Sequence, residues 1–437
     1  MTRRRKFFVS LSTACALALF VLAGGLYAGG TKEATHAAAP SAPAVKELSL
    51  WDFHTGNEGD FFKNLAASYS QVDPGVKINV EQIPWDDYLG TKLETAFAAG
   101  AGPDVFFVSP GTIGKYINSG IALQLNSYMN SSEVSDFTPS SLSGVSIGDS
   151  IYALPFEVEL VGLYYNADML KAAGVQPPKT WAELKSAALK LKTNKRAGIT
   201  VSVHKGAYQV YTWYPFMWMT GANVFTPDMK NSDLSNPGVA KALQLWKDLV
   251  TSGAANLQPS RSTTDIGILG DGETAMQICG TWAIPTIEQK YAKENIQVEP
   301  LPIPEGGKPA SDAGGWKLMV NAKGKYPTEA AKFAVWAVAK NVQAWVQWTT
   351  VVKFAYSPRK SVMDAAQSVF QKGLRAVFTK EIYGTDKPEI RMPPEASNIV
   401  QDMLQNAMFN PSYDGTRAAR EADQKLKDFL SHYNGHI

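Results

Sequence analysis

The sequence is poor in cysteine and histidine. It contains 2 Cys and 5 His among 437 residues. Loss of an N-terminal export segment would leave Cys279 as the only cysteine, so we expect no disulfide within the chain. No His-Glu-x-x-His pattern occurs, and a metal site is therefore not indicated. No cofactor is expected either.

Neither sign of charge is in excess. The chain has 42 Lys and Arg against 40 Asp and Glu. Four basic residues lie at positions 3–6 and residues 1–28 contain no acid, which leaves 38 basic and 40 acidic side chains in the remainder. A nearly neutral body gives no electrostatic reason to expect a nucleic-acid partner. With 45% apolar residues, the chain can form two or three domains with large cores.

The first 28 residues are predicted to be an export signal. A basic start precedes an apolar run from Phe7 to Ala23, and cleavage is expected after Ala23 or Ala28. A retained membrane anchor is the alternative, because this mainly apolar run of 17 residues approaches the length of a membrane span. Cys15 lies too early in this run to be a lipid-attachment site. Residues 29–45 are rich in Ala, Pro, Gly and Ser and predict a flexible linker. We expect a periplasmic or extracytoplasmic location.

From residue 46 onward, short strands alternate with longer helices. The first strands are expected at 47–51, 76–83 and 104–109, with helices at 58–71 and 85–100 between them. This order predicts an α/β lobe with helices on both faces of its sheet. Past Leu154 the order changes to a strand at 158–166, helices at 167–174, 177–193 and 239–253, a strand at 273–280, and helices at 326–340 and 416–433. A second lobe is expected before the chain returns to the first.

Two patterns could suggest an enzyme. Gly144 to Gly148 has the spacing of a nucleophile elbow around Ser146, but a strand ending in proline follows where a helix is required. Glu157 and Glu159 could be a glycosidase pair, yet carboxylates two residues apart do not flank a sugar bond from opposite sides. The same two residues could also lie in solvent or pair with lysine. No catalytic residue is predicted.

Aromatic residues are abundant, with 11 Trp and 17 Tyr. Most are expected to pack in the cores, but those at strand ends can line a ligand site in an α/β fold. Trp282 follows an expected strand and Trp316 precedes one, while Tyr211 and Trp213 belong to a run of aromatics. An aromatic face can stack on the C–H face of a sugar ring, and polar groups can then bind the hydroxyls.

Five segments in order, 96–110, 152–184, 270–285, 301–338 and 410–430, resemble the extracellular solute-binding proteins (family 1) of ABC importers, the maltose-binding-protein-like sugar binders. The resemblance implies a two-lobed clamshell of type II in which each lobe is a mixed sheet flanked by helices. It implies a first lobe of residues 46–156 and 313–362 and a second of 157–312 and 363–437. The lobes would close on a carbohydrate and present it to a membrane permease without catalysis, as a monomer.

The resemblance also carries ligand-binding roles over to this sequence. The expected contacts are His54, Ser109, Glu157, Glu159, Tyr211, Trp213, Trp282, Gly315, Trp316 and Arg359. Glu159 and Glu157 are expected on a face open to the cleft, where Glu159 accepts hydrogen bonds from sugar hydroxyls. Val108 and Phe53 depart from the family pattern, which argues against maltose as the ligand. A charged solute, such as a polyamine or a sugar phosphate, and an exported polysaccharide-cleaving enzyme are the alternatives.

Overall fold

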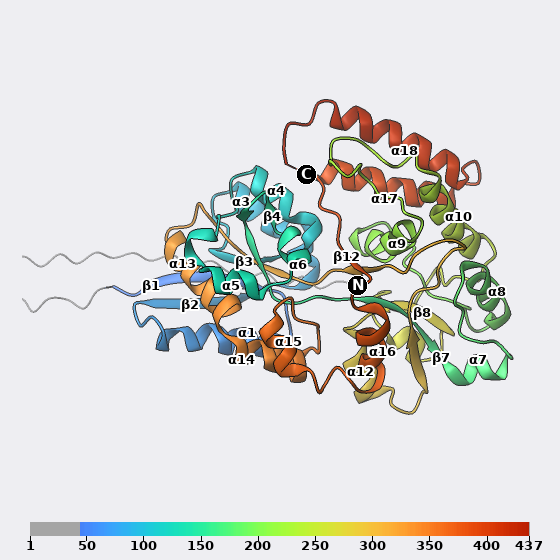
Figure 1. Cartoon of the computed structure of the whole chain (residues 1–437), viewed down its shortest axis with the longest axis horizontal. Coiled ribbons are helices and arrows are strands. Elements are labelled where there is room, and N and C mark those ends of the chain that lie inside the picture. The colour runs from blue at the N-terminus through green and yellow to red at the C-terminus, as the bar shows by residue number, and fades with distance from the viewer. Residues whose placement is uncertain (1–43, 437) are drawn as a thin grey trace, which may run out of the picture. The chain divides into compact units, whose positions relative to one another are not determined.

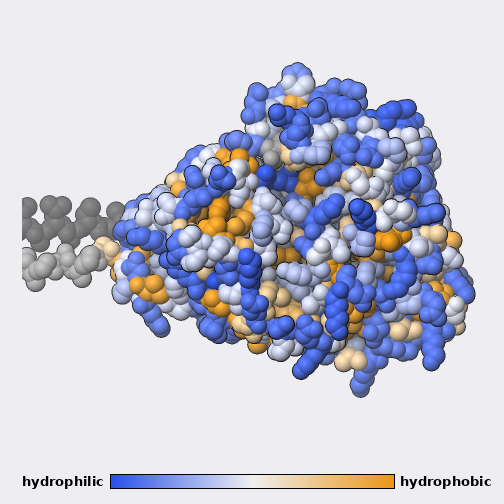
Figure 2. All heavy atoms as spheres, in the orientation of Figure 1, coloured by the Kyte–Doolittle hydropathy of each residue, from blue (hydrophilic) through white to orange (hydrophobic). Residues whose placement is uncertain are grey.

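A computed structural model describes residues 44–436 (Figure 1). The predicted export signal and most of the predicted linker lie outside the described residues. Within them, no helix is long and apolar enough to cross a membrane. On the face drawn in Figure 2, hydrophobic residues form small patches separated by hydrophilic ones.

A five-stranded sheet organises the first lobe, at the left of Figure 1. Its strands, in spatial order, are β2 (Val76–Gln82), β1 (Lys46–Asp52), β3 (Val105–Val108), β11 (Lys317–Val320) and β6 (Ala153–Pro155). The strands β1, β2 and β3 are parallel, whereas β11 runs antiparallel to both β3 and β6. All four residues of β3 are buried, as expected for a strand covered on both faces.

Helices and one hairpin surround this sheet, and the label η denotes a short 3₁₀ or π helix. The earlier elements are α1 (Gly56–Ser68), η1 (Tyr69–Gln71), α2 (Trp85–Asp87), η2 (Tyr88–Lys92), α3 (Leu93–Ala98), η3 (Pro110–Thr112), α4 (Ile113–Asn118), η4 (Asn126–Tyr128), α5 (Ser131–Asp136), α6 (Pro139–Ser143), β4 (Ser146–Ile147) and β5 (Ser150–Ile151). The later ones are α13 (Pro327–Val335), η5 (Trp336–Lys340), α14 (Val342–Gln347), η6 (Trp348–Val352) and α15 (Lys360–Ala366). The core between them includes Phe62, Phe107, Phe156, Trp345 and Trp348.

The second lobe has a three-stranded antiparallel sheet, β8 (Met276–Gly280), β7 (Val161–Asn166) and β9 (Ile296–Glu299). Its helices are α7 (Ala167–Ala172), α8 (Trp181–Leu191), α9 (Ala207–Met219), α10 (Pro237–Thr251), α11 (Gly267–Gly270), α12 (Ala283–Lys290), α16 (Gly373–Val377), η7 (Phe378–Ile382), α17 (Pro394–Phe409) and α18 (Gly415–Leu430). In α18 the buried Ala418, Ala422 and Leu426 recur every four residues and form the apolar stripe that packs on the core.

Segments that connect the two lobes lie next to one another. Residues 156–160 connect β6 to β7, and Val158 in this segment forms an antiparallel bridge with Tyr356. The second crossing continues from β10 (Ser311–Ala313), which pairs in parallel with β12 (Asp386–Pro388). There the Gly314 backbone N–H donates to the Glu159 carbonyl at 3.0 Å. The neighbouring crossings bring residues distant in sequence to one place.

The predicted α/β class and two-lobed organisation are confirmed. The capping box at Thr180 and Glu183 is also present at the start of α8. The strand expected at 158–166 is shorter, because residues 156–160 do not join the sheet. The helix expected at 85–100 contains a five-residue π-helical segment, η2.

Candidate functional site

Glu157 lies in the first crossing segment, residues 156–160, and its side chain is fully buried. Its Oε1 accepts hydrogen bonds from the Trp316 backbone N–H at 3.0 Å and from Lys353 Nζ at 3.1 Å. Its Oε2 accepts from Trp348 Nε1, also at 3.1 Å. Burying a carboxylate is tolerable here because three donors satisfy it and one of them is charged.

Glu159 shares the same counter-charge. Its Oε1 lies 3.3 Å from Lys353 Nζ, and its Oε2 accepts a hydrogen bond from the Thr281 hydroxyl. Burial raises the pKa of Glu159 to about 7, against the lowering effect of the Lys353 ammonium. For Lys353, the carboxylates of Glu157, Glu58 and Glu159 outweigh burial and raise the pKa above its ordinary value.

The two glutamates are therefore not on an open face, and that expectation is wrong. Glu157 is 0% exposed and Glu159 4% exposed, because Lys353 and its neighbours cover them. The lysine pairing considered for them in the sequence is what the structure shows.

A first aromatic group, Phe53, Trp85 and Trp316, lies beside this segment in the first lobe. The Phe53 and Trp316 rings have centroids 4.5 Å apart, and Trp85 meets both edge-on at 4.9 and 5.6 Å. Trp85 is 46% exposed, so this group offers an aromatic surface to solvent. The hydrogen bond from the Trp316 backbone to Glu157 fixes the group to the crossing segment.

A second aromatic group, Tyr208, Tyr211 and Trp282, comes from the second lobe. Tyr208 and Tyr211, one turn apart on α9, stack with centroids 6.0 Å apart, and Trp282 lies 6.0 and 6.2 Å from them. The Tyr211 hydroxyl donates to the Glu159 carbonyl at 3.0 Å. Both aromatic groups are thus attached to the same short segment, one through Glu157 and the other through Glu159.

Gly314 and Gly315 complete this arrangement because they allow close backbone approach. A Cβ at Gly314 would lie 2.5 Å from the Tyr211 ring, and one at Gly315 would lie 2.8 Å from the Glu157 carbonyl oxygen. Gly315 also has φ +86°, a conformation that strains any residue with a side chain. The sequence Gly-Gly-Trp therefore lets Trp316 reach the crossing segment.

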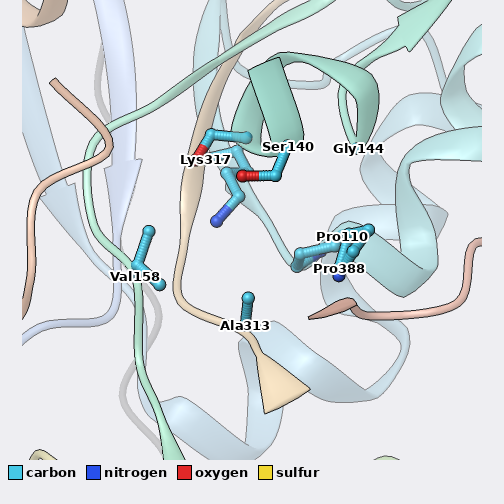
Figure 3. A pocket seen from close by; sticks show the side chains of 8 residues that line it. Pro110, Ser140, Gly144, Val158, Ala313, Lys317 and Pro388 are labelled. Atoms are coloured by element: carbon cyan, nitrogen blue, oxygen red, sulfur yellow. The ribbon is translucent and has the colours of Figure 1, made fainter. Parts of the chain in front are cut away.

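A small pocket of about 20 Å³ lies at the crossings (Figure 3). It is lined by Pro110, Ser140, Ser141, Gly144, Val158, Ala313, Lys317 and Pro388. In Figure 3, Val158 lies at one side and Pro110 with Pro388 at the other. Lys317 Nζ donates to the carbonyls of Glu157, Gly314 and Gly315 at 3.1–3.2 Å. Burial lowers the pKa of Lys317 to about 8.

Asp312, next to this pocket lining, is fully buried and neither carboxylate oxygen has a hydrogen-bond partner among the described residues. Burial, reinforced by the neighbouring Glu389, raises the pKa of Asp312 well above its ordinary value. Glu389 itself has its pKa raised to about 7, again mainly by burial. Burial thus disfavours the charged form of both carboxyl groups.

The remaining predicted contacts lie at varied positions. His54 is buried beside Phe53, and its Nδ1 lies 2.6 Å from Asp52. Ser109 begins η3, with its hydroxyl 3.3 Å from that of Thr112. We predict from the sequence that both are ligand contacts, and their role stays a prediction.

Two of the predicted contacts are buried, and within the described residues neither is in direct ring contact or hydrogen bonding with either aromatic group. Trp213 is fully buried in the core of the second lobe. The Arg359 guanidinium is bound by Asp136 at 2.7 Å and by the Val338 carbonyl at 2.9 Å, so its donors serve the first lobe. Trp213 thus packs in the core, and Arg359 forms hydrogen bonds within the first lobe.

Four residues of the site are missed in the sequence, namely Trp85, Tyr208, Trp348 and Lys353. Trp85 follows a strand in Ile-Pro-Trp and Tyr208 precedes Tyr211 by three residues, so strand-end position and helical spacing could have indicated both. Nothing local marks Lys353, which lies 196 residues from Glu157.

Comparison with known proteins agrees with this architecture. A family model described as bacterial extracellular solute-binding protein matches residues 55–344. A binding protein of Brucella abortus is 28% identical over 273 residues, which cover 61% of this chain and 65% of that protein. The maltotriose-binding protein of Pyrococcus abyssi is 28% identical over 301 residues, covering 66% of this chain and 62% of that protein. The matched region thus spans less than two thirds of the length of either relative.

Among solved structures, the GacH receptor of Streptomyces glaucescens, described unliganded and in complex with acarbose, has the same fold. It superposes with a TM-score of 0.76 at 22% identity, over 89% of this chain and 100% of that one. The family resemblance expected from the sequence is confirmed. Because the family model covers well over half of the chain, the protein belongs to the bacterial extracellular solute-binding protein family.

Proposed function

We propose that this protein is the extracytoplasmic binding subunit of an ABC importer, and that it captures a sugar or short oligosaccharide between its two aromatic groups. The observation that carries the proposal is the attachment of one aromatic group from each lobe to the same crossing segment, through Glu157 and Glu159. Aromatic faces suit sugar rings, and a change in lobe orientation would move the two groups relative to each other. A membrane permease would receive the solute.

Two features favour binding over hydrolysis. The Glu157 and Glu159 carboxylates both contact one ammonium, that of Lys353, and both come from one short segment. A glycosidase instead places its two carboxyl groups on opposite sides of the sugar bond, about 5–10 Å apart. The shared ammonium also neutralises part of the acidic charge, which favours a neutral sugar over a polyamine.

A thermal-shift panel tests the proposal. The full mature chain is heated with maltotriose, cellotriose, raffinose or trehalose, and with spermidine and glucose 6-phosphate for the charged-solute alternative. A true ligand at 100 times its dissociation constant adds about 2.7 kcal/mol to the unfolding free energy, and calorimetry then gives its affinity. Product analysis after long incubation shows whether the sugar is returned unchanged.

Trp282→Ala provides the site-specific test. We expect it to weaken binding of the selected sugar about tenfold or more, because it removes the stacking face of the second aromatic group. Trp336→Ala is the matched control, since Trp336 is also half-buried but packs on Tyr69 in the first lobe. Equal affinities for the two variants, or turnover of the sugar, would contradict the proposal.

A further inference from the structure

Lys353 connects groups that no other described cation brings together. It is the C-cap residue of η6, a segment whose Trp348 is buried in the first-lobe core. The lysine side chain is 11% exposed, and its Nζ lies 3.1 Å from Glu157, 3.3 Å from Glu159 and 3.9 Å from Glu58. A single ammonium therefore faces three carboxylates, two of which belong to the crossing segment.

Each of those two carboxylates also accepts a hydrogen bond from an element that carries an aromatic residue. Glu157 accepts the Trp316 backbone N–H in the first lobe. Glu159 accepts the hydroxyl of Thr281, and Thr281 directly precedes Trp282 in the second lobe. The contacts thus run from Lys353 to both aromatic groups.

We propose that Lys353 is a positioning residue for the solute site, whose ammonium holds Glu157 and Glu159 side by side and thereby sets the positions of Trp316 and Trp282. The inference rests on the proposed function, in which both aromatic groups contact the sugar. Lys353 itself touches no sugar in this scheme. It acts through the two glutamates.

The charge balance around Glu159 explains why this role needs a cation. The charged groups that face Glu159 are Lys353, Glu157, Glu58 and Lys317, and the neutral titratable groups that face it are Tyr164, Tyr211 and Cys279. Lys317 already donates to three carbonyl groups. Without Lys353, two neighbouring buried carboxylates repel each other, and one of them must take up a proton or move.

A double-mutant cycle tests the coupling between Lys353 and Glu159. The variants are Lys353→Met, Glu159→Gln and the double variant, with Lys353→Arg as the conservative replacement. Binding is measured by calorimetry at pH 6 and pH 8 with whichever sugar of the panel above raises Tm most. Lys340→Met is the matched control, because Lys340 also ends a helical segment, η5, and pairs only with Glu133 in the first lobe.

We expect Lys353→Met to weaken binding at least tenfold at pH 8 and to regain most of that loss at pH 6, where Glu159 takes up a proton. The double variant should lose less affinity relative to Glu159→Gln than Lys353→Met loses relative to the wild type, because only Glu157 then lacks its counter-charge and no second carboxylate repels it. Lys353→Arg and Lys340→Met should stay within threefold of the wild type. A purely structural role would give a loss that is independent of pH and of Glu159.

The outcomes separate this inference from the proposed function. If the wild type binds no sugar, the proposed function fails. If it does bind, then wild-type affinity for Lys353→Met, or equal losses with and without Glu159→Gln, overturns the inference. Should Lys353→Met fail to fold, the affinity of the double variant is compared with that of Glu159→Gln. If the double variant binds more than tenfold more weakly than Glu159→Gln, the positioning role of Lys353 is refuted. Thermal unfolding without sugar at pH 6 and 8 repeats the cycle independently of the ligand.

Discussion

Truncation of Glu157 should destabilise the protein more than truncation of any exposed glutamate. Glu157→Ala removes the acceptor of three hydrogen bonds from a fully buried position. The Trp348 indole N–H and the Trp316 backbone N–H lose their partner, and Lys353 loses the nearest of its three carboxylates. The lobes meet at this segment, so the change affects both.

The magnitude follows from the donors left behind. Breaking a buried ion pair by removing one partner costs about 3–5 kcal/mol, and a buried donor left unpaired costs about 1–3 kcal/mol. Lys353 keeps Glu159 at 3.3 Å, which limits the loss. We therefore expect about 3–5 kcal/mol in all, equivalent to a fall in Tm of about 3–6 °C at about 2 cal/mol/K of unfolding entropy per residue. Glu157→Gln keeps the shape and one acceptor, and should cost less.

Urea unfolding followed by tryptophan fluorescence at pH 7.5, with calorimetry for Tm, measures this loss. Glu305→Ala is the control, because Glu305 is exposed in a turn of the second lobe, and a change within about 0.5 kcal/mol is expected there. If Glu157→Ala unfolds at the same urea concentration as Glu305→Ala, the three hydrogen bonds do not stabilise the crossing segment and the reasoning is refuted.

Two further predictions concern other positions. Because the pKa of Asp312 is raised in the folded state, its ionisation costs stability as pH rises above the ordinary range for aspartate. Asp312→Asn should therefore be more stable than wild type at pH 8 by about 1–3 kcal/mol. Its urea midpoint should change less between pH 5 and 8 than that of the wild type, and an equal change would contradict this. Thr180→Ala removes the side-chain acceptor of the Glu183 backbone N–H and should lower the free energy of unfolding, measured by chemical denaturation, by about 1 kcal/mol. Thr251→Ala is the control and should cost less, because it loses only a donation to the Lys247 carbonyl. Equal losses of unfolding free energy would argue against the cap.

Much of the fold was predictable because its signals are local. The apolar run of β3 and the capping box of α8 each depend on residues within a few positions of one another. α9 was not recognised, although it begins at Ala207 and contains an aromatic run. Eleven of its thirteen residues are buried, so it has no polar face to give a helical period, and Pro215 within it is an unfavourable signal.

The candidate site was predictable only in part. Trp282, Trp316 and Gly315 were expected from strand-end position and from the family resemblance; Gly315 and Trp316 lie at the second crossing, and Trp282 follows Thr281, which binds Glu159 of the first. Burial of Glu157 could not be foreseen, because its counter-charge comes from Lys353, 196 residues away. A carboxylate in an apolar run indicates that a partner exists, but local sequence does not identify the partner.

The order of strands in the first sheet also constrains how the chain is made. β11, residues 317–320, lies between β3 and β6, so a nascent chain that stops before residue 317 exposes two unpaired strand edges where that sheet should be continuous. Unpaired edges bind other strands readily. The N-terminal half therefore leaves the ribosome without a finished sheet and can close it only when translation has passed the whole stretch between β6 and β11. Late closure of this kind leaves both edges open to other strands until residue 317 has been made.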